Sequence, residues 1–390
     1  MTRITPDSPG RRFAALAVLL GATAVLTAGA AQAGSAAHRT WKVEPTPNPA
    51  AADISVLSSV ACTSRRACTA VGSSARSLSS PTVPVAERWN GKRWHIQRIP
   101  APPGSSDTLY GVSCPAAHDC VAVGSAYYKL GRRQIPLVEA WNGRRWRVQS
   151  TPAITSPSSL YAVSCPSRSS CIAVGYLLTA PDHAIVERWD GRTWRTDPLP
   201  QLAGSTQLFG VSCPKLRACT AVGNQNDGSA RPLAESWDGA RWHLQAVPAP
   251  RAALLDAVSC TSPAACIATG TNLATGGRTL AERWDGKTWR VYPTPNPADL
   301  ALSFGTVQLN GVSCVSPVAC NATGEYSPHG APAYFLESWN GSRWRLETTP
   351  HAAGDARGNL LGIACTRARC TAVGAGPSRT RLQATLAIAG

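Results

Sequence analysis

The chain has 390 residues, of which 44% are hydrophobic, and its formal net charge is +16 at pH 7. This length fits either one large repeat body or about two to three ordinary domains. Beyond the N-terminal region no run of about 18 apolar residues occurs, which excludes a further membrane span. This net charge favours anionic partners, namely acidic wall polymers, acidic glycans, lipid head groups or nucleic acid bound without sequence specificity. The alternative is that basic residues are simply spread along the chain, which would give the same net charge.

Residues 1–33 have the pattern of an export signal peptide. They contain the basic pair Arg11-Arg12, an apolar run over about 13–26 and an A-x-A cleavage site at 31–33. Both the general and the twin-arginine export routes fit this pattern. We expect a mature chain that begins with a short spacer at 34–40 and is secreted to the extracellular space, with attachment to the cell wall left open.

The next element is a short strand at residues 41–45, which starts with Trp41 and leads into the run Pro-Thr-Pro-Asn-Pro. The same run follows the strand that starts at Trp289, at the end of a complete repeat unit. The strand at 41–45 therefore resembles the fourth strand of a unit whose first three strands are missing at this end of the chain.

Seven local cysteine pairs follow, six with the spacing C-x5-C and the last with C-x4-C. Their first members recur every 47 to 54 residues, a period typical of propeller blades. Zinc sites usually have closer spacings backed by further ligands, and no histidine recurs at a fixed position, so we predict disulfides and no metal. The predicted disulfides join Cys62 with Cys68, Cys114 with Cys120, Cys165 with Cys171, Cys213 with Cys219, Cys260 with Cys266, Cys314 with Cys320, and Cys365 with Cys370.

A second motif, E-x-W-[N/D]-G-x-x-W, occurs in six copies between the cysteine pairs. Asn-Gly or Asp-Gly between apolar runs predicts a β-hairpin, closed either by a two-residue turn or by a four-residue loop. In both cases the two indoles and the glutamate share one face. Indoles could serve as sugar platforms and glutamates as acids or bases, but equal copies in every unit favour packing between blades and a hydrogen bond within each blade. The hairpins start at Trp89, Trp141, Trp189, Trp237, Trp284 and Trp339, two residues after Glu87, Glu139, Glu187, Glu235, Glu282 and Glu337.

Each unit thus has four short strands: L-x-G-V-S-C, C-x-A-V-G, an apolar run ending in E-x-W, and W-x-V. The last unit, from about residue 359 to 390, has no tryptophan hairpin and no fourth strand. The strand at 41–45 should complete it, which closes a ring and removes edge strands. We therefore predict an all-β fold, a seven-bladed β-propeller of four-stranded blades over residues 41–390.

In unit length, strand pattern and the tryptophan of the last strand, the repeat resembles kelch-type and galactose-oxidase-type propellers. The G-x-x-W hairpin is similar to the Asp-box of sialidase-like propellers. A tryptophan stands where an Asp-box has its aspartate, and A-V-G stands where kelch repeats have a Gly-Gly doublet. The chain also resembles secreted actinobacterial repeat proteins without an assigned activity. These resemblances imply the fold and carry no catalytic residue to this chain.

Function is expected where the units differ. The loops between second and third strands and between blades vary, and so does the position four residues before the first cysteine of each unit, which should open near the ring axis. Three aromatic side chains, an aspartate and an asparagine there would form a mouth for a sugar or a peptide, while ordinary packing between blades is the alternative. The candidate binding residues are Tyr110, Tyr161, Phe209, Asp256 and Asn310, flanked by Ser58 and Leu361.

No catalytic, phosphate-binding or dinucleotide motif occurs, so we predict no cofactor. The sequence favours a secreted, non-catalytic binding or scaffold propeller whose ligand is a glycan, a cell-wall polymer or another secreted protein. The alternative is a secreted carbohydrate-active hydrolase or lyase of sialidase-like type that uses the variable loops.

Overall fold

The computed structural model describes residues 40–129, 132–248, 252–297, 307–327, 332–350, 357–377 and 384–390. The chain divides into residues 1–38 and one compact unit, residues 39–390. The predicted signal peptide lies outside the described residues, as does the spacer apart from Thr40, so both stay predictions. In the described part the helical element is a single 3-10 turn, η1 (Leu273–Thr275), and no helix there has the length and hydrophobicity needed to cross a membrane.

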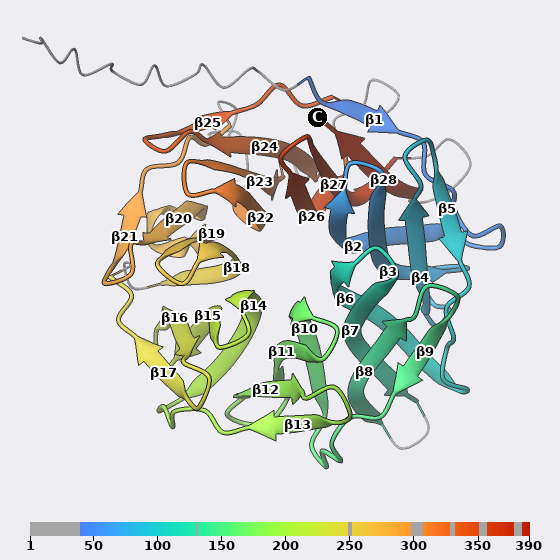
Figure 1. The fold of residues 1–390 in the computed structure, drawn as a ribbon, viewed down its shortest axis with the longest axis horizontal. Coiled ribbons are helices and arrows are strands. Elements are labelled where there is room, and N and C mark those ends of the chain that lie inside the picture. Colours follow the sequence, from blue (N-terminus) through green and yellow to red (C-terminus); the bar gives the residue numbers. More distant parts are fainter. Residues whose placement is uncertain are drawn as a thin grey trace, which may run out of the picture. The chain divides into compact units, whose positions relative to one another are not determined.

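Seven four-stranded antiparallel sheets form the blades of a ring (Figure 1). Each inner strand lies against the inner strands of both neighbouring blades, and the last lies against the first, which confirms the predicted seven-bladed propeller. The inner strands are β2 (Ile54–Ser64), β6 (Ser105–Ala116), β10 (Ser158–Ser167), β14 (Ser205–Lys215), β18 (Ala253–Ser262), β22 (Gln308–Ser316) and β26 (Asn359–Thr366). The second strands are β3 (Ala67–Ala75), β7 (Asp119–Tyr128), β11 (Ser170–Leu177), β15 (Ala218–Asn226), β19 (Ala265–Asn272), β23 (Ala319–Tyr326) and β27 (Arg369–Gly376).

The two outer positions of each blade are filled by the strands that flank the tryptophan hairpin. The third strands are β4 (Val83–Trp89), β8 (Arg133–Trp141), β12 (His183–Trp189), β16 (Ala230–Trp237), β20 (Arg278–Trp284), β24 (Ala333–Trp339) and β28 (Ala384–Ala389). The outermost strands are β5 (Trp94–Gln97), β9 (Trp146–Gln149), β13 (Trp194–Asp197), β17 (Trp242–Gln245), β21 (Trp289–Tyr292), β25 (Trp344–Leu346) and, in the seventh blade, β1 (Lys42–Glu44).

Strand β1 closes the ring as the sequence predicted. It pairs antiparallel with β28, with Val43 opposite Ile388. The indole of Trp41 is buried beside Leu360, and Glu44 accepts a hydrogen bond from Nε1 of Trp94 in the first blade at 3.2 Å. The N-terminal strand therefore completes the seventh blade and also ties that blade to the first.

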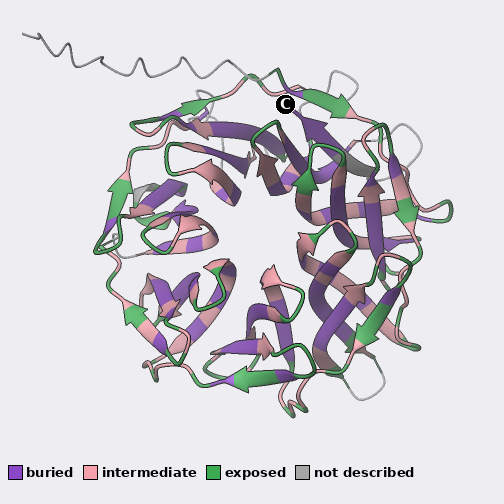
Figure 2. Ribbon diagram, in the orientation of Figure 1, coloured by how far each residue is buried: buried purple, intermediate pink, exposed green. Residues whose placement is uncertain are grey.

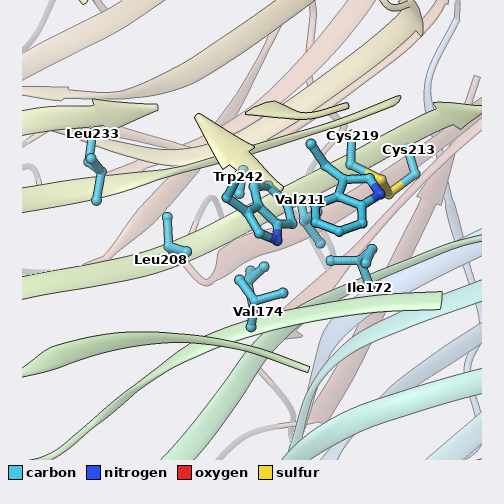
Figure 3. Close-up of a cluster of buried hydrophobic side chains, with 11 residues drawn as sticks. Ile172, Val174, Leu208, Val211, Cys213, Cys219, Leu233 and Trp242 are labelled. Carbon is cyan, nitrogen blue, oxygen red and sulfur yellow. A yellow bond between two sulfur atoms is a disulfide. The ribbon is translucent and has the colours of Figure 1, made fainter. Parts of the chain in front are cut away.

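The hydrophobic core is divided into seven clusters, one at each junction between neighbouring blades. In the cluster of Figure 3, Ile172 and Val174 of the third blade pack against Leu208, Val211 and Trp242 of the fourth. Burial of one such leucine contributes about 2 kcal/mol. Figure 2 shows that buried residues are most frequent in the middle strands of the blades and exposed residues in the outermost ones.

All seven predicted disulfides are present, and each joins the first and second strands of one blade with the two Cα atoms 4.0 Å apart. A bridge that closes so short a loop should stabilise its blade by about 2 kcal/mol. The second cysteine of every pair is at most 3% exposed, so each bridge extends into the core of its blade. These buried cysteines are Cys68, Cys120, Cys171, Cys219, Cys266, Cys320 and Cys370.

The tryptophan hairpins close with a four-residue loop, so of the two turns that fitted the sequence the shorter one is wrong. Trp89 lies directly opposite Trp94, and Asn90 Oδ1 accepts hydrogen bonds from the backbone N–H groups of Lys92 and Arg93 at 2.9 and 3.0 Å. Only the glycine of the loop, Gly91, adopts a positive φ, of 94°. The asparagine side chain therefore holds the loop, which explains why this position is Asn or Asp in every copy.

The two indoles of a hairpin have different partners. Nε1 of Trp89 donates to the carbonyl of Arg65 in the cysteine hairpin of its own blade at 3.2 Å. Nε1 of Trp146 donates to Gln97 Oε1, at the end of the outermost strand of the preceding blade, at 2.9 Å. In these two cases the first indole joins two hairpins within a blade and the second joins neighbouring blades, which agrees with the packing role expected from their repetition. The Nε1 atoms of Trp141 and Trp242 have no such partner among the described residues.

Candidate functional site

The variable position of each inner strand is the extra residue of a β-bulge. In β10, Leu160 lies opposite Gly175 and Ala162 lies opposite Val174, so Tyr161 between them has no partner on β11. The same register shift occurs in the other six inner strands. A bulge re-aims its extra side chain out of the normal alternation, so this residue can change without moving the leucine that precedes it into the core. The seven bulge residues are Ser58, Tyr110, Tyr161, Phe209, Asp256, Asn310 and Leu361.

The glycine of A-V-G makes room for the bulge. A Cβ atom on Gly175 would lie 1.9 Å from the carbonyl oxygen of Ser159, two residues before the bulge. The equivalent contact is 1.9 to 2.1 Å in five further blades. Glycine inside a strand is a known signal of a bulge. The glycine of A-V-G, which the sequence analysis assigns only to the end of the second strand, therefore also indicated the bulge.

The bulge residues surround an axial cavity of about 220 Å³. Its lining begins at the bulge residue and continues for the next two residues in six inner strands, and in the first blade it consists of Ser58 and Ser59. Because each inner strand runs from its bulge toward its first cysteine, the cavity extends from the bulge ring toward the cysteine hairpins. All five predicted binding residues, Tyr110, Tyr161, Phe209, Asp256 and Asn310, line this cavity together.

Aromatic rings gather on one side of the bulge ring. Tyr161 stacks on Tyr110 at 4.9 Å between ring centroids and on Tyr176 at 5.2 Å, so it lies between them. Phe209 meets Tyr161 edge-on at 5.6 Å. Both faces of Tyr161 are therefore covered, whereas no second ring covers the outer face of Tyr110 among the described residues.

Acids and amides gather on the other side. Burial, and to a smaller extent the nearby carboxylate of Glu325, raise the pKa of Asp256 to about 7. Glu325 Oε1 accepts a hydrogen bond from Gln308 Nε2 at 2.7 Å. Burial raises the pKa of Glu325 as well, while hydrogen bonds from Gln308 and Asn310 oppose that rise. Near neutral pH this side can both donate and accept hydrogen bonds and can carry negative charge.

Tyr176 and Glu325 were missed as site residues. Neither is among the five predicted binding residues, but each directly follows the bulge glycine of its second strand, Gly175 or Gly324. That position varies among the blades just as the bulge position does, and this variation was the signal that could have revealed them. Ligand contact was also expected in the loops between second and third strands and between blades, and of these loops the segment 299–304 and His329 lie outside the described residues.

The repeated glutamates lie away from the cavity, in the third strands. They are at most 1% exposed, and burial raises the pKa of Glu187 and Glu282 to about 7, while burial and the carboxylate of Asp107 raise that of Glu139 to about 8. The expected hydrogen bond within each blade is not found for Glu139, Glu187, Glu282 and Glu337, whose carboxyl oxygens have no hydrogen-bond partner among the described residues. These residues are buried in the third strands and do not line the axial cavity.

No group of three or more His, Cys, Asp or Glu side chains is arranged to hold a metal ion in the part of the chain that the structure describes. The bridged cysteines do not line the axial cavity either. The candidate site therefore consists of the aromatic, amide and carboxyl groups of the bulge ring and of the residues directly beside it.

Comparison with solved structures supports the fold. YCF48 bound to D1 peptide aligns with a TM-score of 0.54 and 13% identity over 90% of this chain and 95% of that one. A mutant of Trypanosoma rangeli sialidase displaying trans-sialidase activity aligns with a TM-score of 0.46 and 9% identity over 86% of this chain and 54% of that one. A mutant Aleuria aurantia lectin in complex with Fucα1-6GlcNAc gives 0.46 and 11% over 80% of this chain and 100% of that one.

No protein-family model matches the sequence, and the comparison with curated proteins gave no significant match. The chain is a seven-bladed β-propeller, consistent with the resemblance to kelch-type and Asp-box propellers in its repeat. The identities are too low to carry any residue role from these neighbours to this chain.

Proposed function

We propose that this protein is a secreted, non-catalytic binding propeller that takes a sugar ring of a glycan or cell-wall polymer, or a side chain of another secreted protein, at the bulge ring. The observation that supports this proposal most is the division of the ring into an aromatic side and a polar side. An aromatic face contributes apolar contact to a flat ligand, and carboxyl or amide groups opposite it fix the ligand's orientation.

The outer face of Tyr110 is the best place for stacking. Around the ring Tyr110 is followed by Tyr161, which covers one of its faces, and is preceded by Ser58. Ser58 has the smallest side chain of the seven bulge residues. We therefore expect the open space in the bulge ring to lie beside Ser58, next to the outer face of Tyr110. A ligand stacked on Tyr110 there would extend toward Asn310 and Asp256 across the axis.

Export to the extracellular space agrees with the disulfides. No cysteine among the described residues is free, and disulfides persist in oxidising compartments and are rare in reducing ones. A scaffold role fits the same fold, and the peptide bound to YCF48 is an example of a protein ligand on a propeller.

The test uses the purified mature chain, residues 34–390, on a glycan array and in a pull-down from cell-wall fractions. The variant Tyr110→Ala should weaken binding about tenfold, because it removes the stacking face. The matched control is Tyr127→Ala, since Tyr127 is 40% exposed on β7 and does not line the cavity. Equal binding by wild type and Tyr110→Ala would rule out the bulge ring as the site.

A second candidate function, glycoside hydrolysis, is favoured by one observation, the carboxyl pair Asp256 and Glu325. One carboxyl with a raised pKa beside a second is the usual acid and base or nucleophile of such enzymes. Turnover of chromogenic glycosides that is abolished by Asp256→Asn and by Glu325→Gln would support this candidate. Binding without turnover in the wild type would reject it.

A further inference from the structure

The loops of the two hairpin types meet on one face of the ring. A Cβ atom on Gly91 of the first tryptophan hairpin would lie 2.9 Å from the side chain of Arg66 in the cysteine hairpin, and one on Gly143 would lie 3.1 Å from that of His118. The indole bond from Trp89 to Arg65 joins the same two loops. We define the hairpin face as the residues between paired cysteines together with the residues between paired tryptophans.

This face is strongly basic. Fourteen exposed Lys and Arg side chains stand in its loops, against the four carboxylates Asp119, Asp190, Asp238 and Asp285. Eleven of the fourteen are arginines, whose planar fork suits paired hydrogen bonds to oxyanions. The cations are Arg65, Arg66, Lys92, Arg93, Arg144, Arg145, Arg168, Arg192, Lys215, Arg217, Arg241, Lys287, Arg343 and Arg367.

Almost none of this charge is neutralised within the protein. Of the fourteen cations, only Arg168 forms a salt bridge among the described residues, with Asp119 at 2.7 Å. The other three carboxylates hold the backbone of their own loops. Asp190 Oδ1, for example, accepts from the N–H groups of Arg192 and Thr193 at 2.9 and 2.8 Å.

The scaffold does not require these cations. In each tryptophan hairpin the Asn or Asp and the Gly are explained by the loop geometry, and the tryptophans by packing. Yet the third or fourth loop position also carries a Lys or Arg in all six hairpins. These side chains are exposed and form no salt bridge among the described residues, so their repetition indicates a role outside the fold.

The chemistry of the face indicates recognition through charge. The second indole of each hairpin is at most 5% exposed, and the exposed aromatic residue among the described ones, Tyr127, lies on the side of the second-to-third-strand loops. The first indole of each hairpin is buried or half-buried, so no fully exposed ring is available here for bases or sugar rings to stack on. Leu216 and Val318 are exposed apolar loop residues, which is too few for insertion into a membrane.

We propose that the hairpin face binds a linear phosphate polymer through these cations, independently of the axial site. A flexible chain with a phosphate at short intervals can engage several blades at once, because six of the seven blades present a cation at the equivalent place in the tryptophan hairpin. Many weak contacts in one chain then give useful affinity. The polymer would lie on the face opposite the variable loops.

The probe is fluorescently labelled long-chain inorganic polyphosphate, titrated with the purified mature chain. A six-site variant removes one exposed cation from each tryptophan hairpin: Lys92→Ser, Arg144→Ser, Arg192→Ser, Arg241→Ser, Lys287→Ser and Arg343→Ser. It should bind at least about tenfold more weakly, and wild-type binding should fall steeply between about 0.05 and 0.5 M salt.

A control with the same change in net charge keeps the hairpin face intact: Arg76→Ser, Arg98→Ser, Lys129→Ser, Arg132→Ser, Arg133→Ser and Arg278→Ser. These exposed residues lie at the opposite ends of the strands. The control should bind within about twofold of wild type. Equal losses in both variants would overturn the proposal, because binding would then depend on net charge and not on the hairpin face. Absence of wild-type binding at low salt would overturn it as well.

Two further arms separate the phosphate polymer from other anions. Polygalacturonate, a carboxylate polymer, should bind more weakly than polyphosphate, and the reverse order would overturn the assignment to phosphate. Vesicles of anionic lipid should bind weakly, and tight binding that is lost in Leu216→Ser with Val318→Ser would replace the polymer by a membrane surface. Neither outcome bears on the axial site, which is tested by Tyr110→Ala.

Discussion

At the residue scale, each inner strand carries a bulge residue near the axis that the neighbouring strand does not pair. In β10 this residue is Tyr161, and the leucine before it, Leu160, is fully buried between blades. The bulge thus separates a position that faces the axis from one that packs the core. Because the strand ladder resumes after the bulge, substitution of Tyr161 leaves the register of the blade unchanged.

The bulge glycine should tolerate no side chain. In Gly175→Ala the new methyl group would lie 1.9 Å from the carbonyl oxygen of Ser159, so the inner strand must shift. We expect a loss of about 3 kcal/mol in the free energy of unfolding, measured by denaturant titration. The control Gly104→Ala has no atom within 4 Å of its Cβ but a φ of 76°, and should lose only about 1 kcal/mol. A Gly175→Ala protein as stable as wild type would contradict the role given to this glycine.

The buried glutamates should make stability fall as pH rises. The pKa of Glu187 is raised from 4.5 to about 7 in the folded protein, so the folded state holds the proton more tightly than the unfolded state. The stability linked to this carboxyl is fully present below about pH 4.5 and is lost as pH increases through about 7. Because Gln is uncharged and nearly isosteric, Glu187→Gln should be more stable than wild type at pH 8, by on the order of 2 kcal/mol.

The measurement is the melting temperature of both proteins at pH 4 and pH 8. The gain from Glu187→Gln should be much larger at pH 8 than at pH 4, whereas the exposed control Asp53→Asn should show no such difference. A gain of the same size at both pH values would show that Glu187 does not titrate in this range.

Residue roles were predictable from the sequence where repetition exposed them. The five candidate residues of the bulge ring were found because they vary at one place in a regular strand. The bulge itself was not predicted, although the glycine of A-V-G was a signal for it, because the register with the partner strand decides which residue of the inner strand is left unpaired. The predicted hydrogen bond is missing for Glu139, Glu187, Glu282 and Glu337. Repetition showed that the glutamates share a structural role, but it did not show which interactions they make.

At the element scale, neighbouring blades are joined by serines as well as by indoles. The serine before the first cysteine accepts a hydrogen bond from the backbone N–H of the first cysteine in the next blade, as in Ser113 to Cys165 at 2.9 Å. Four further junctions have the same bond. The first and seventh blades have Ala61 and Ala364 at this position, so their junctions cannot form it.

Restoring the serine should stabilise these two junctions. In Ala61→Ser the new hydroxyl would accept from the N–H of Cys114, and in Ala364→Ser from that of Cys62. Each bond should add about 0.5 to 1 kcal/mol to the free energy of unfolding. The reverse control, Ser164→Ala, removes an existing bond and should lower stability by about 1 kcal/mol. If both substitutions acted in the same direction, the bond would not be the cause.

Strands and hairpins were predictable because their signals are local: alternating apolar residues, the Asn-Gly or Asp-Gly pair, and cysteines at short spacing. The loop length was not predictable, since the same dipeptide fits two closures. The structure decides between them through the opposition of Trp89 and Trp94, which brings their ring centroids to 5.8 Å. Contacts between blades, such as Gln97 with Trp146, join residues about fifty positions apart and have no local signature.

At the scale of the whole molecule, stability depends on closure. The first blade packs against the seventh through Leu57, Val60, Val373 and Ala387, and the seventh is complete only with β1. The sequence predicted this arrangement, because the last unit lacks a fourth strand and residues 41–45 resemble a fourth strand without its first three.

Removal of β1 should therefore destabilise the entire ring. A protein that starts at Thr46 loses the buried indole of Trp41 and the contacts of Glu44 with Trp94 and Arg369. We expect a loss of about 3 to 5 kcal/mol, seen as a sharply lower melting temperature. The control starts at Thr40, just before Trp41, and should melt like the mature chain. An unchanged melting temperature for the shorter protein would refute closure by this strand.

The bulge ring also bears on how such a molecule can change. Each blade supplies one side chain to the axis, while the leucine before it and the glycine opposite maintain the backbone. A library randomised at those seven codons would sample new specificities with little risk to folding. The specificity of the axial site is thus set by seven side chains on a constant backbone, and single substitutions can change it one blade at a time.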